Sequence, residues 1–265
     1  MMNPTEKRFE NLFAGKTGLI LGVANERSLA WSIAKELHQG GAKLAFNFLG
    51  ESLERRVRPL AESVQAEIIE PCNLSDDAQI DALFEKIKTR WGHLDYLIHS
   101  VAFANKEDLE GRFVDTSRAG FQLALDISAY TLVATAKRAE PLMEGRNGSI
   151  VTLSYYGAEK VVPNYNVMGV AKAALEASVR YLAYDLGSKK IRVNAISAGP
   201  IKTLAAAGIK NFRSMLSSAE EKTPLHETID GEDVGTLAAF LCSPMGKHIT
   251  GSTLYVDSGA HIMGA

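Results

Sequence analysis

The 265-residue chain alternates short apolar runs with longer amphipathic ones. The short runs are bounded by turn residues, which is typical of buried strands, and the longer ones repeat apolar residues at helical spacing. Strands that alternate with helices of this length indicate βαβ units with right-handed crossovers. We therefore expect a parallel sheet covered by helices on both faces.

The pattern places these elements along the whole chain. We expect strands at residues 17–21, 43–48, 67–70, 95–101, 149–154, 191–197 and 253–256. We expect helices at residues 28–39, 52–63, 77–91, 117–141, 165–187 and 232–242. The predicted fold class is α/β, a doubly wound Rossmann-type sheet in a single domain over residues 1–265. Residues 199–230 break the alternation, and we expect a helical insertion there that binds substrate, since such loops follow strand carboxyl ends.

Composition excludes several partners and sites. The formal net charge is −2, with no basic cluster among aromatic residues, so we expect no nucleic-acid partner. No apolar run approaches eighteen residues and residues 1–16 lack a signal-like apolar segment, so we expect a cytoplasmic protein with no membrane partner. Cys72 and Cys242 are far apart, which predicts two reduced, buried thiols and no metal site.

The turn after the first predicted strand suits a dinucleotide. Gly22 follows the strand directly, as a tight turn requires, and Ser28 is a good N-cap for the helix that begins next. A pyrophosphate could rest on that helix N-terminus. The two later glycines of the dinucleotide fingerprint are replaced, however, so this segment alone fits a plain strand-to-helix turn equally well.

One tyrosine and one lysine have a spacing that suits catalysis. Lys172 follows Tyr165 by seven residues, which closes two helical turns to within about 20° and predicts a shared helix face. A free tyrosine titrates near 10, and a neighbouring cation favours the phenolate. The pair could therefore be a proton donor with the group that tunes it, although tyrosine and lysine also share helix faces by chance.

Four stretches carry a resemblance to a known family: residues 22–30, residues 99–104, Tyr155 and Tyr165 with Lys172, and residues 192–204. Together they resemble the bacterial NADH-dependent enoyl-acyl carrier protein reductases, a branch of the short-chain dehydrogenase/reductase superfamily. The similarity extends from about Leu12 to the end of the chain. Ordinary superfamily members have their tyrosine four positions before the lysine, where this chain has Met168, and a serine at the place of Tyr155.

The resemblance implies an oxidoreductase of fatty-acid biosynthesis that uses NADH to reduce the trans-2 double bond of an enoyl thioester carried on acyl carrier protein. Tyr165 would donate a hydrogen bond to the thioester oxygen, and Lys172 would bind the nicotinamide ribose. Tyr155 would shape the pocket or assist protonation of the α-carbon. The family also implies a homotetramer.

The same resemblance implies which residues bind cofactor and substrate. The cofactor would contact Gly22, Ser28, Leu29, Leu49, Asn73, Leu74, Ser100, Val101, Ala102, Lys172, Ile201, Lys202, Thr203, Leu204 and Ala205. The substrate would contact Ala104, Leu109, Tyr155, Tyr165, Met168, Ile209, Phe212 and Met215. Asn73 departs from the aspartate of many relatives, and it is also a good turn residue. The end of the second predicted strand offers neither an acid for a ribose hydroxyl nor a base for a 2′-phosphate, and we favour NADH.

Two other functions stay open. A ketone or alcohol dehydrogenase of the same superfamily would share the fold but not the lysine spacing. A catalytically silent dinucleotide sensor would bind cofactor without turnover.

Overall fold

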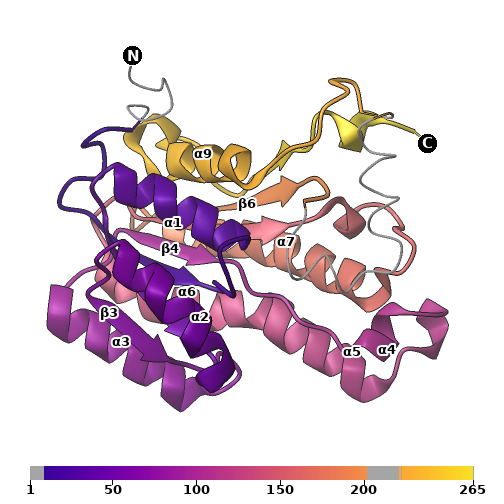
Figure 1. Ribbon diagram of the computed structural model, residues 1–265, viewed down its shortest axis with the longest axis horizontal. Helices are drawn as coiled ribbons and strands as arrows, with labels where there is room; N and C mark the ends of the chain where they lie inside the picture. Colours follow the sequence, from indigo (N-terminus) through magenta and orange to yellow (C-terminus); the bar gives the residue numbers. More distant parts are fainter. Residues whose placement is uncertain (1–8, 202–220, 222, 265) are drawn as a thin grey trace.

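The computed structural model describes residues 9–201, 221 and 223–264. Within them, seven parallel strands form one sheet in the order β3-β2-β1-β4-β5-β6-β7 (Figure 1). The strands are β1 Thr17–Leu21, β2 Lys43–Phe48, β3 Ile68–Pro71, β4 Tyr96–His99, β5 Ser149–Ser154, β6 Arg192–Ala198 and β7 Thr253–Val256. This topology confirms the predicted Rossmann-type parallel sheet.

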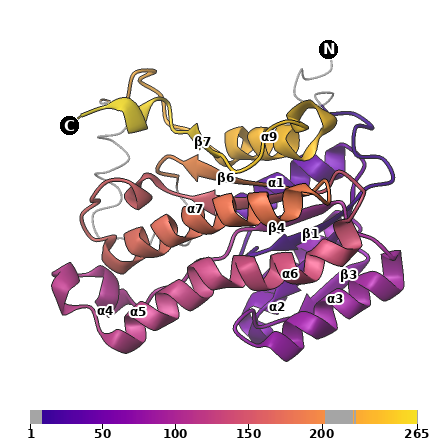
Figure 2. The ribbon, with the colours of Figure 1, turned by 180° about the vertical axis from the view of Figure 1, so that it is seen from behind.

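Helices cover both faces of the sheet (Figures 1 and 2). On one face lie α1 (Leu29–Gln39), α2 (Gly50–Ser63) and α9 (Gly231–Cys242). The other face is covered by α3 (Asp77–Trp91), α6 (Thr131–Met143) and α7 (Asn166–Gly187). The remaining described elements are α4 (Lys106–Leu109), α5 (Arg118–Leu125) and the short turns η2 (Phe113–Asp115), η3 (Asp126–Tyr130), η4 (Tyr156–Ala158), η6 (Pro244–Gly246) and η7 (Ala260–Ile262).

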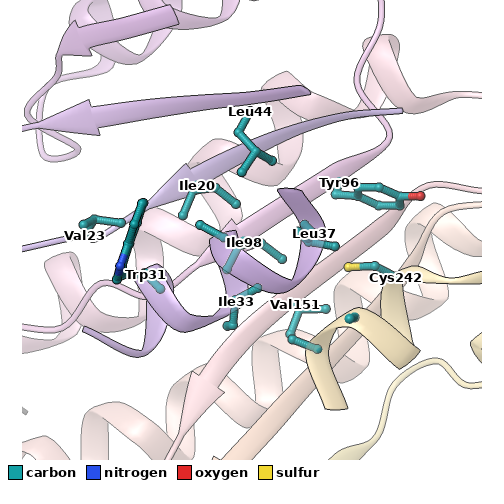
Figure 3. Close-up of a cluster of buried hydrophobic side chains, with 14 of the residues drawn as sticks. Ile20, Val23, Trp31, Ile33, Leu37, Leu44, Tyr96, Ile98, Val151 and Cys242 are labelled. Carbon is teal, nitrogen blue, oxygen red and sulfur yellow. The ribbon is translucent and has the colours of Figure 1, made fainter. Parts of the chain in front are cut away.

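The period of two along each strand divides the core between these faces. In β1, Ile20 packs on the α1 side, whereas Leu19 and Leu21 pack on the α6 side. Figure 3 shows Ile33 and Leu37 of α1 lying among strand side chains on the first face. Because both faces are covered, β1, β4, β5 and β6 are buried at every position, their polar residues included.

Strands β1, β2, β5 and β7 and helix α3 have the predicted bounds, and the other predicted elements differ by a few residues. The helix predicted at 117–141 is interrupted, because η3 is a π-helical turn between α5 and α6. There the Thr131 hydroxyl donates to the Ile127 carbonyl at 2.6 Å, and Ser128 Oγ both accepts from Phe103 N–H and donates to Phe103 O. Such side-chain bonds compete with the regular helical ladder.

Strand order changes direction between β1 and β4, where the chain crosses from one half of the sheet to the other. Ligands of open α/β sheets bind outside the strand carboxyl ends at such a switch point. The predicted cofactor residues after β1, β2, β3 and β4 all lie along this edge.

Further features of the described residues concern membrane-spanning helices, metal ligands and free thiols. None of their helices is both long and apolar enough to cross a membrane. The same residues contain no group of three or more His, Cys, Asp or Glu side chains placed to hold a metal ion. Cys72 and Cys242 are buried free thiols, as predicted, and burial raises the pKa of Cys72 to about 11 and that of Cys242 to about 12.

Candidate active site

The turn after β1 requires a glycine for two reasons. Gly22 has a φ of +95°, and a Cβ added there would lie 2.0 Å from the carbonyl oxygen of Ser100. Ser100 follows β4, and its N–H donates to Leu21 O at 3.1 Å. The ends of β1 and β4 therefore approach each other as backbone only, which confirms the predicted tight turn.

Ser28 is the N-cap residue of α1 by position, but its hydroxyl does not cap the helix. Its Oγ accepts from Ala24 N–H at 3.0 Å and from Asn25 N–H at 3.1 Å, and so folds the turn instead. The predicted capping bond is therefore wrong, since the turn amides use the oxygen that the helix would have used. The N-terminus of the eleven-residue α1 follows the turn after β1 and has no side-chain cap, and an uncapped helix N-terminus can accept a pyrophosphate.

The other predicted cofactor residues that the structure describes lie at the same edge of the sheet, and they differ in exposure and hydrogen bonding. Leu49, directly after β2, is 56% exposed. Asn73, after β3, accepts from Ser75 N–H at 3.1 Å through its side-chain oxygen, which is the turn role that the sequence also allowed. Ile201 is half-buried at the last described position before the gap. The predicted contacts Lys202, Thr203, Leu204 and Ala205 lie outside the described residues.

Two tyrosines meet at the carboxyl end of β5. Tyr155 follows that strand, Tyr165 is the N-cap residue of α7, and their rings meet edge to face at 70° with centroids 5.0 Å apart. Tyr165 stands between Asn164 and Asn166, both in left-handed backbone conformation at φ 63° and 36°. Asparagine tolerates that region better than most residues, so this pair sets the direction of Tyr165 at the start of the helix.

Small residues let the Tyr165 ring sit close to the turn after β5. A Cβ at Gly157 would lie 2.5 Å from the Tyr165 ring, and one at Gly169 would lie 2.7 Å from the Gly157 carbonyl. These two glycines allow η4 and α7 to approach each other around the ring. Their role was not predicted from the sequence, although both lie between Tyr155 and Lys172.

The electrostatics of Tyr165 differ from the prediction. Burial raises the pKa of the Tyr165 phenol well above its usual value, and nearby Tyr155 raises it further. The expectation that a cation favours the phenolate is wrong for this structure, because desolvation dominates and Lys172 Nζ points to a backbone carbonyl instead. At neutral pH Tyr165 is a neutral hydrogen-bond donor.

Lys172 is buried in α7 with 7% of its surface exposed. Its Nζ donates to Leu153 O at 2.7 Å, near the end of β5. Burial lowers the pKa of Lys172 to about 8, and the nearby charge of Glu176 opposes that change. The ammonium keeps two further N–H donors for another partner.

An apolar cluster of side chains surrounds the tyrosine pair. Tyr165, Met168 and Ala171 form a buried cluster against partly buried Ala104, Leu109, Leu125, Tyr155 and Val162. The structure therefore brings together the predicted substrate residues Ala104, Leu109, Tyr155, Tyr165 and Met168, and it adds Leu125 and Val162. The other predicted contacts, Ile209, Phe212 and Met215, lie outside the described residues. A mostly apolar lining with few polar groups is typical of small-ligand sites.

Two buried polar groups near Lys172 were not predicted from the sequence. Glu176, one turn after Lys172, accepts from Ser154 Oγ at 2.5 Å. His99 is fully buried at the end of β4, with Nε2 2.8 Å from Thr131 Oγ1 and Nδ1 3.1 Å from Thr152 Oγ1. Burial and the charge of Lys172 lower the pKa of His99 to about 3, so its ring is neutral. A carboxylate on the apolar face of a helix was the available signal for Glu176.

Comparison with known proteins agrees with this arrangement over nearly the whole chain. The family model described as "Enoyl-(Acyl carrier protein) reductase" matches residues 22–261. This chain belongs to the enoyl-acyl carrier protein reductase family. It is 53% identical over 253 residues to the NADH enoyl-acyl carrier protein reductase of Aquifex aeolicus, covering 96% of this chain and 94% of that one. The corresponding Bacillus cereus enzyme is 52% identical over 255 residues, covering 96% and 99%.

Solved structures of family members have the same fold. The Aquifex aeolicus enzyme superposes with a TM-score of 0.93 at 52% identity, covering 96% of this chain and 99% of the other. The Anaplasma phagocytophilum enzyme in complex with NAD gives a TM-score of 0.92 at 48% identity, covering 97% and 96%. Members of the family therefore share the sheet order and the layers described above.

Proposed function

We propose that this protein is an NADH-dependent enoyl-acyl carrier protein reductase, which saturates the trans-2 double bond of an enoyl thioester in fatty-acid elongation. The observation that carries the proposal is the neutral Tyr165 phenol, buried beside Tyr155 and an apolar cluster, with the Lys172 ammonium bonded to Leu153 O near the end of β5. The family relatives, named as NADH enoyl-acyl carrier protein reductases, support the same reaction.

The residues present fit a dinucleotide. Only a glycine fits at position 22, where a Cβ would meet the Ser100 carbonyl, and the uncapped N-terminus of α1 offers N–H donors to a pyrophosphate. When bound, NADH would supply a hydride to the β-carbon of the substrate. Gly22, Ser28 and Leu29 would face the pyrophosphate, Asn73 and Leu74 the adenine, and the loop 100–102 the centre of the cofactor.

Tyr165 would stabilise the charge that reduction creates. Hydride addition to the β-carbon leaves negative charge on the thioester oxygen, and a preorganised donor at that oxygen lowers the barrier. Tyr165 qualifies because burial keeps its proton on the phenol. Tyr155, whose ring meets it edge to face, would shape the pocket or assist protonation of the α-carbon.

Lys172 would hold the nicotinamide ribose. One of its three N–H donors is used by Leu153 O, which fixes the ammonium at the end of β5 and leaves two donors for hydroxyl groups. Because burial brings its pKa to about 8, binding of the ribose would favour the charged form.

The end of β2 supports NADH over NADPH. Asn47 is turned inward, donating to Cys72 O at 3.1 Å, and apolar Phe48 and Leu49 follow it. Arg55 and Arg58, in the first turns of α2, pair with Glu51 and Glu54 of the same helix. A 2′-phosphate would have to compete with these two glutamates for the arginine side chains. A Bacillus cereus structure is described with NADP+, so the ratio of kcat/KM for the two cofactors deserves direct measurement.

The finer partner assignments are also proposals. The substrate would be presented by acyl carrier protein, and residues 199–230 would bind it. A homotetramer is proposed from the family, and exposed Tyr181 and Tyr184, 75% and 85% accessible on α7, support a subunit contact there. Light scattering would give the mass of the assembly. A cytoplasmic location stays a prediction.

The test is the decrease in absorbance at 340 nm with purified protein, NADH and a crotonyl thioester. We expect rapid oxidation with crotonyl thioester and none with acetoacetyl thioester. The reverse preference would support a ketone reductase of the same fold. Tight NADH binding without oxidation in either case would support the dinucleotide sensor.

A further inference from the structure

Two hydrogen bonds tie α7 to the end of β5, and only one of them comes from the lysine already described. Lys172 Nζ donates to Leu153 O at 2.7 Å, and Ser154 Oγ donates to Glu176 Oε1 at 2.5 Å. The two helix residues are one turn apart, and the two strand residues are adjacent and directly precede Tyr155. Lys172, Glu176 and Ser154 are 7%, 8% and 6% exposed.

We propose that Glu176 is a positioning residue of the reductase: its carboxylate, held by Ser154, keeps the Lys172 ammonium charged and fixes the corner from which Tyr155 projects. The inference rests on the proposed function, because it concerns the lysine that would bind the ribose. Glu176 itself does not touch the reacting atoms.

The charges around the pair are consistent with this role. Burial raises the pKa of Glu176, as does Glu159 beyond η4, whereas the Ser154 hydroxyl, Arg180 and Lys172 lower it. Burial lowers the pKa of Lys172, and Glu176 is the group that raises it. His99, which faces Lys172 from β4, is neutral and adds no second positive charge beside the ammonium. An ionised Glu176 therefore offsets part of the cost of burying the ammonium.

A purely structural carboxyl group and a charge-supplying one give different results on substitution. Glu176→Gln keeps the length of the side chain and an oxygen that accepts from Ser154, so the tether survives while the charge is removed. Glu176→Asp keeps the charge at a shorter reach. Ser154→Ala leaves the carboxylate in place but removes the bond that favours its ionised form. Asp185→Asn, an exposed site on the same helix, is the matched control for loss of one negative charge.

The experiment measures the dissociation constant of NADH by fluorescence from pH 6 to 10 in the full-length protein and these four variants. In the wild type we expect affinity to fall above pH 8, as Lys172 loses its proton. In Glu176→Gln we expect the midpoint of that fall to move down by about one pH unit. Ser154→Ala should lower the pH midpoint by less than Glu176→Gln does. Glu176→Asp should have a midpoint between those of the wild type and Glu176→Gln, and Asp185→Asn should have the wild-type midpoint.

Three outcomes would overturn the proposal. An unmoved midpoint in Glu176→Gln, with affinity lowered equally at every pH, would make the role of Glu176 structural only. Should Glu176→Gln fail to fold, an unmoved midpoint in folded Ser154→Ala would overturn it in the same way. A wild-type affinity that does not fall at alkaline pH would remove the ribose role of Lys172 and this proposal with it. Failure of the proposed function appears separately, as absent crotonyl-thioester reduction with the NADH midpoints still shifted.

Discussion

The turns that follow β1 and β3 and the corner at the end of β5 are built from different interactions. At the first, Gly22, Ser28 and Asn73 make the turns through backbone approach and neutral hydrogen bonds. At the second, Lys172 and Glu176 place ionisable groups inside the protein. Backbone geometry specifies the first region, and forming it buries no charge. The second region buries ionisable groups, and burying a charge opposes folding unless the group has a partner.

Because of this difference, we expect the two regions to respond differently to amino-acid substitutions. A turn set by backbone geometry fails only when a side chain fills the space between strands. A corner set by buried charge fails when one member is neutralised, even if every atom still fits. The predictions below test that contrast from the larger effects to the smaller.

The largest effect should come from Lys172→Met, which keeps the length of the side chain and removes its charge. We expect kcat/KM to fall by about three orders of magnitude, with weaker NADH binding, because both the ribose contact and the local positive charge are lost. Lys172→Arg should retain more of both, since a cation remains. Steady-state kinetics and NADH titration check this, and an unchanged NADH dissociation constant in Lys172→Met would count against the ribose role.

Next in size is the separation of the two tyrosines. Tyr165→Phe loses only the hydroxyl and should lower kcat by roughly one to three orders of magnitude in a folded protein. Tyr155→Phe should cost less if that ring mainly shapes the pocket.

A phenolic inhibitor provides a second readout for the same pair. Its hydroxyl imitates the charged substrate oxygen, so a diphenyl-ether phenol should bind Tyr165→Phe more weakly in the presence of NAD+ and bind Tyr155→Phe almost normally. Larger losses at Tyr155 in both measurements would reverse the assigned roles.

At the turn after β1, Gly22→Ala should destabilise the protein by about 3 kcal/mol and weaken NADH binding, because the new methyl group meets Ser100 O. Gly145→Ala is the control, since Gly145 also has a positive φ of +74° but has nothing within 4 Å of an added Cβ. It should cost about 1 kcal/mol and leave NADH affinity unchanged. Thermal denaturation compares them, and equal losses would show that the close approach of β1 and β4 has no special weight.

The smallest expected effect is the contribution of Lys172 to the pH dependence of the free energy of unfolding. The pKa of Lys172 in the folded cofactor-free protein is about 8, below its ordinary value of 10.5, so the unfolded chain binds more protons between these values. The contribution of Lys172 to the free energy of unfolding therefore increases as pH rises through that window, by on the order of 2 kcal/mol. Denaturant unfolding at pH 7.5 and 10 should show this increment as the difference between wild type and Lys172→Met. Identical pH dependence in both would contradict the shifted lysine.

The fold was largely predictable from the sequence, because the period of the apolar residues sets it directly. Strands β1, β2, β5 and β7 have the predicted bounds, since turn residues mark both of their ends. The π-helical turn was not predictable, because it depends on contacts of Ser128 with Phe103, which is distant in the sequence.

The location of the site residues was predictable from the sequence, whereas the effect of burial on their ionisation was not. Ala104, Leu109 and Met168 gather around the tyrosines as predicted. The direction of the Tyr165 pKa was predicted wrongly, because spacing shows a neighbour in the sequence but not the degree of burial. Glu176 was missed for a related reason: a glutamate in a helix pattern normally faces solvent, and only the packed structure shows its bond to Ser154.

We expect the corner at β5 and α7 to direct a hydride to the β-carbon of an enoyl thioester. The most direct measurement uses NADH carrying deuterium at both C4 positions, crotonyl thioester and mass or NMR analysis of the butyryl product. We expect one deuterium per molecule on the β-carbon and a solvent proton on the α-carbon. Deuterium on the α-carbon, or no saturated product, would contradict the account.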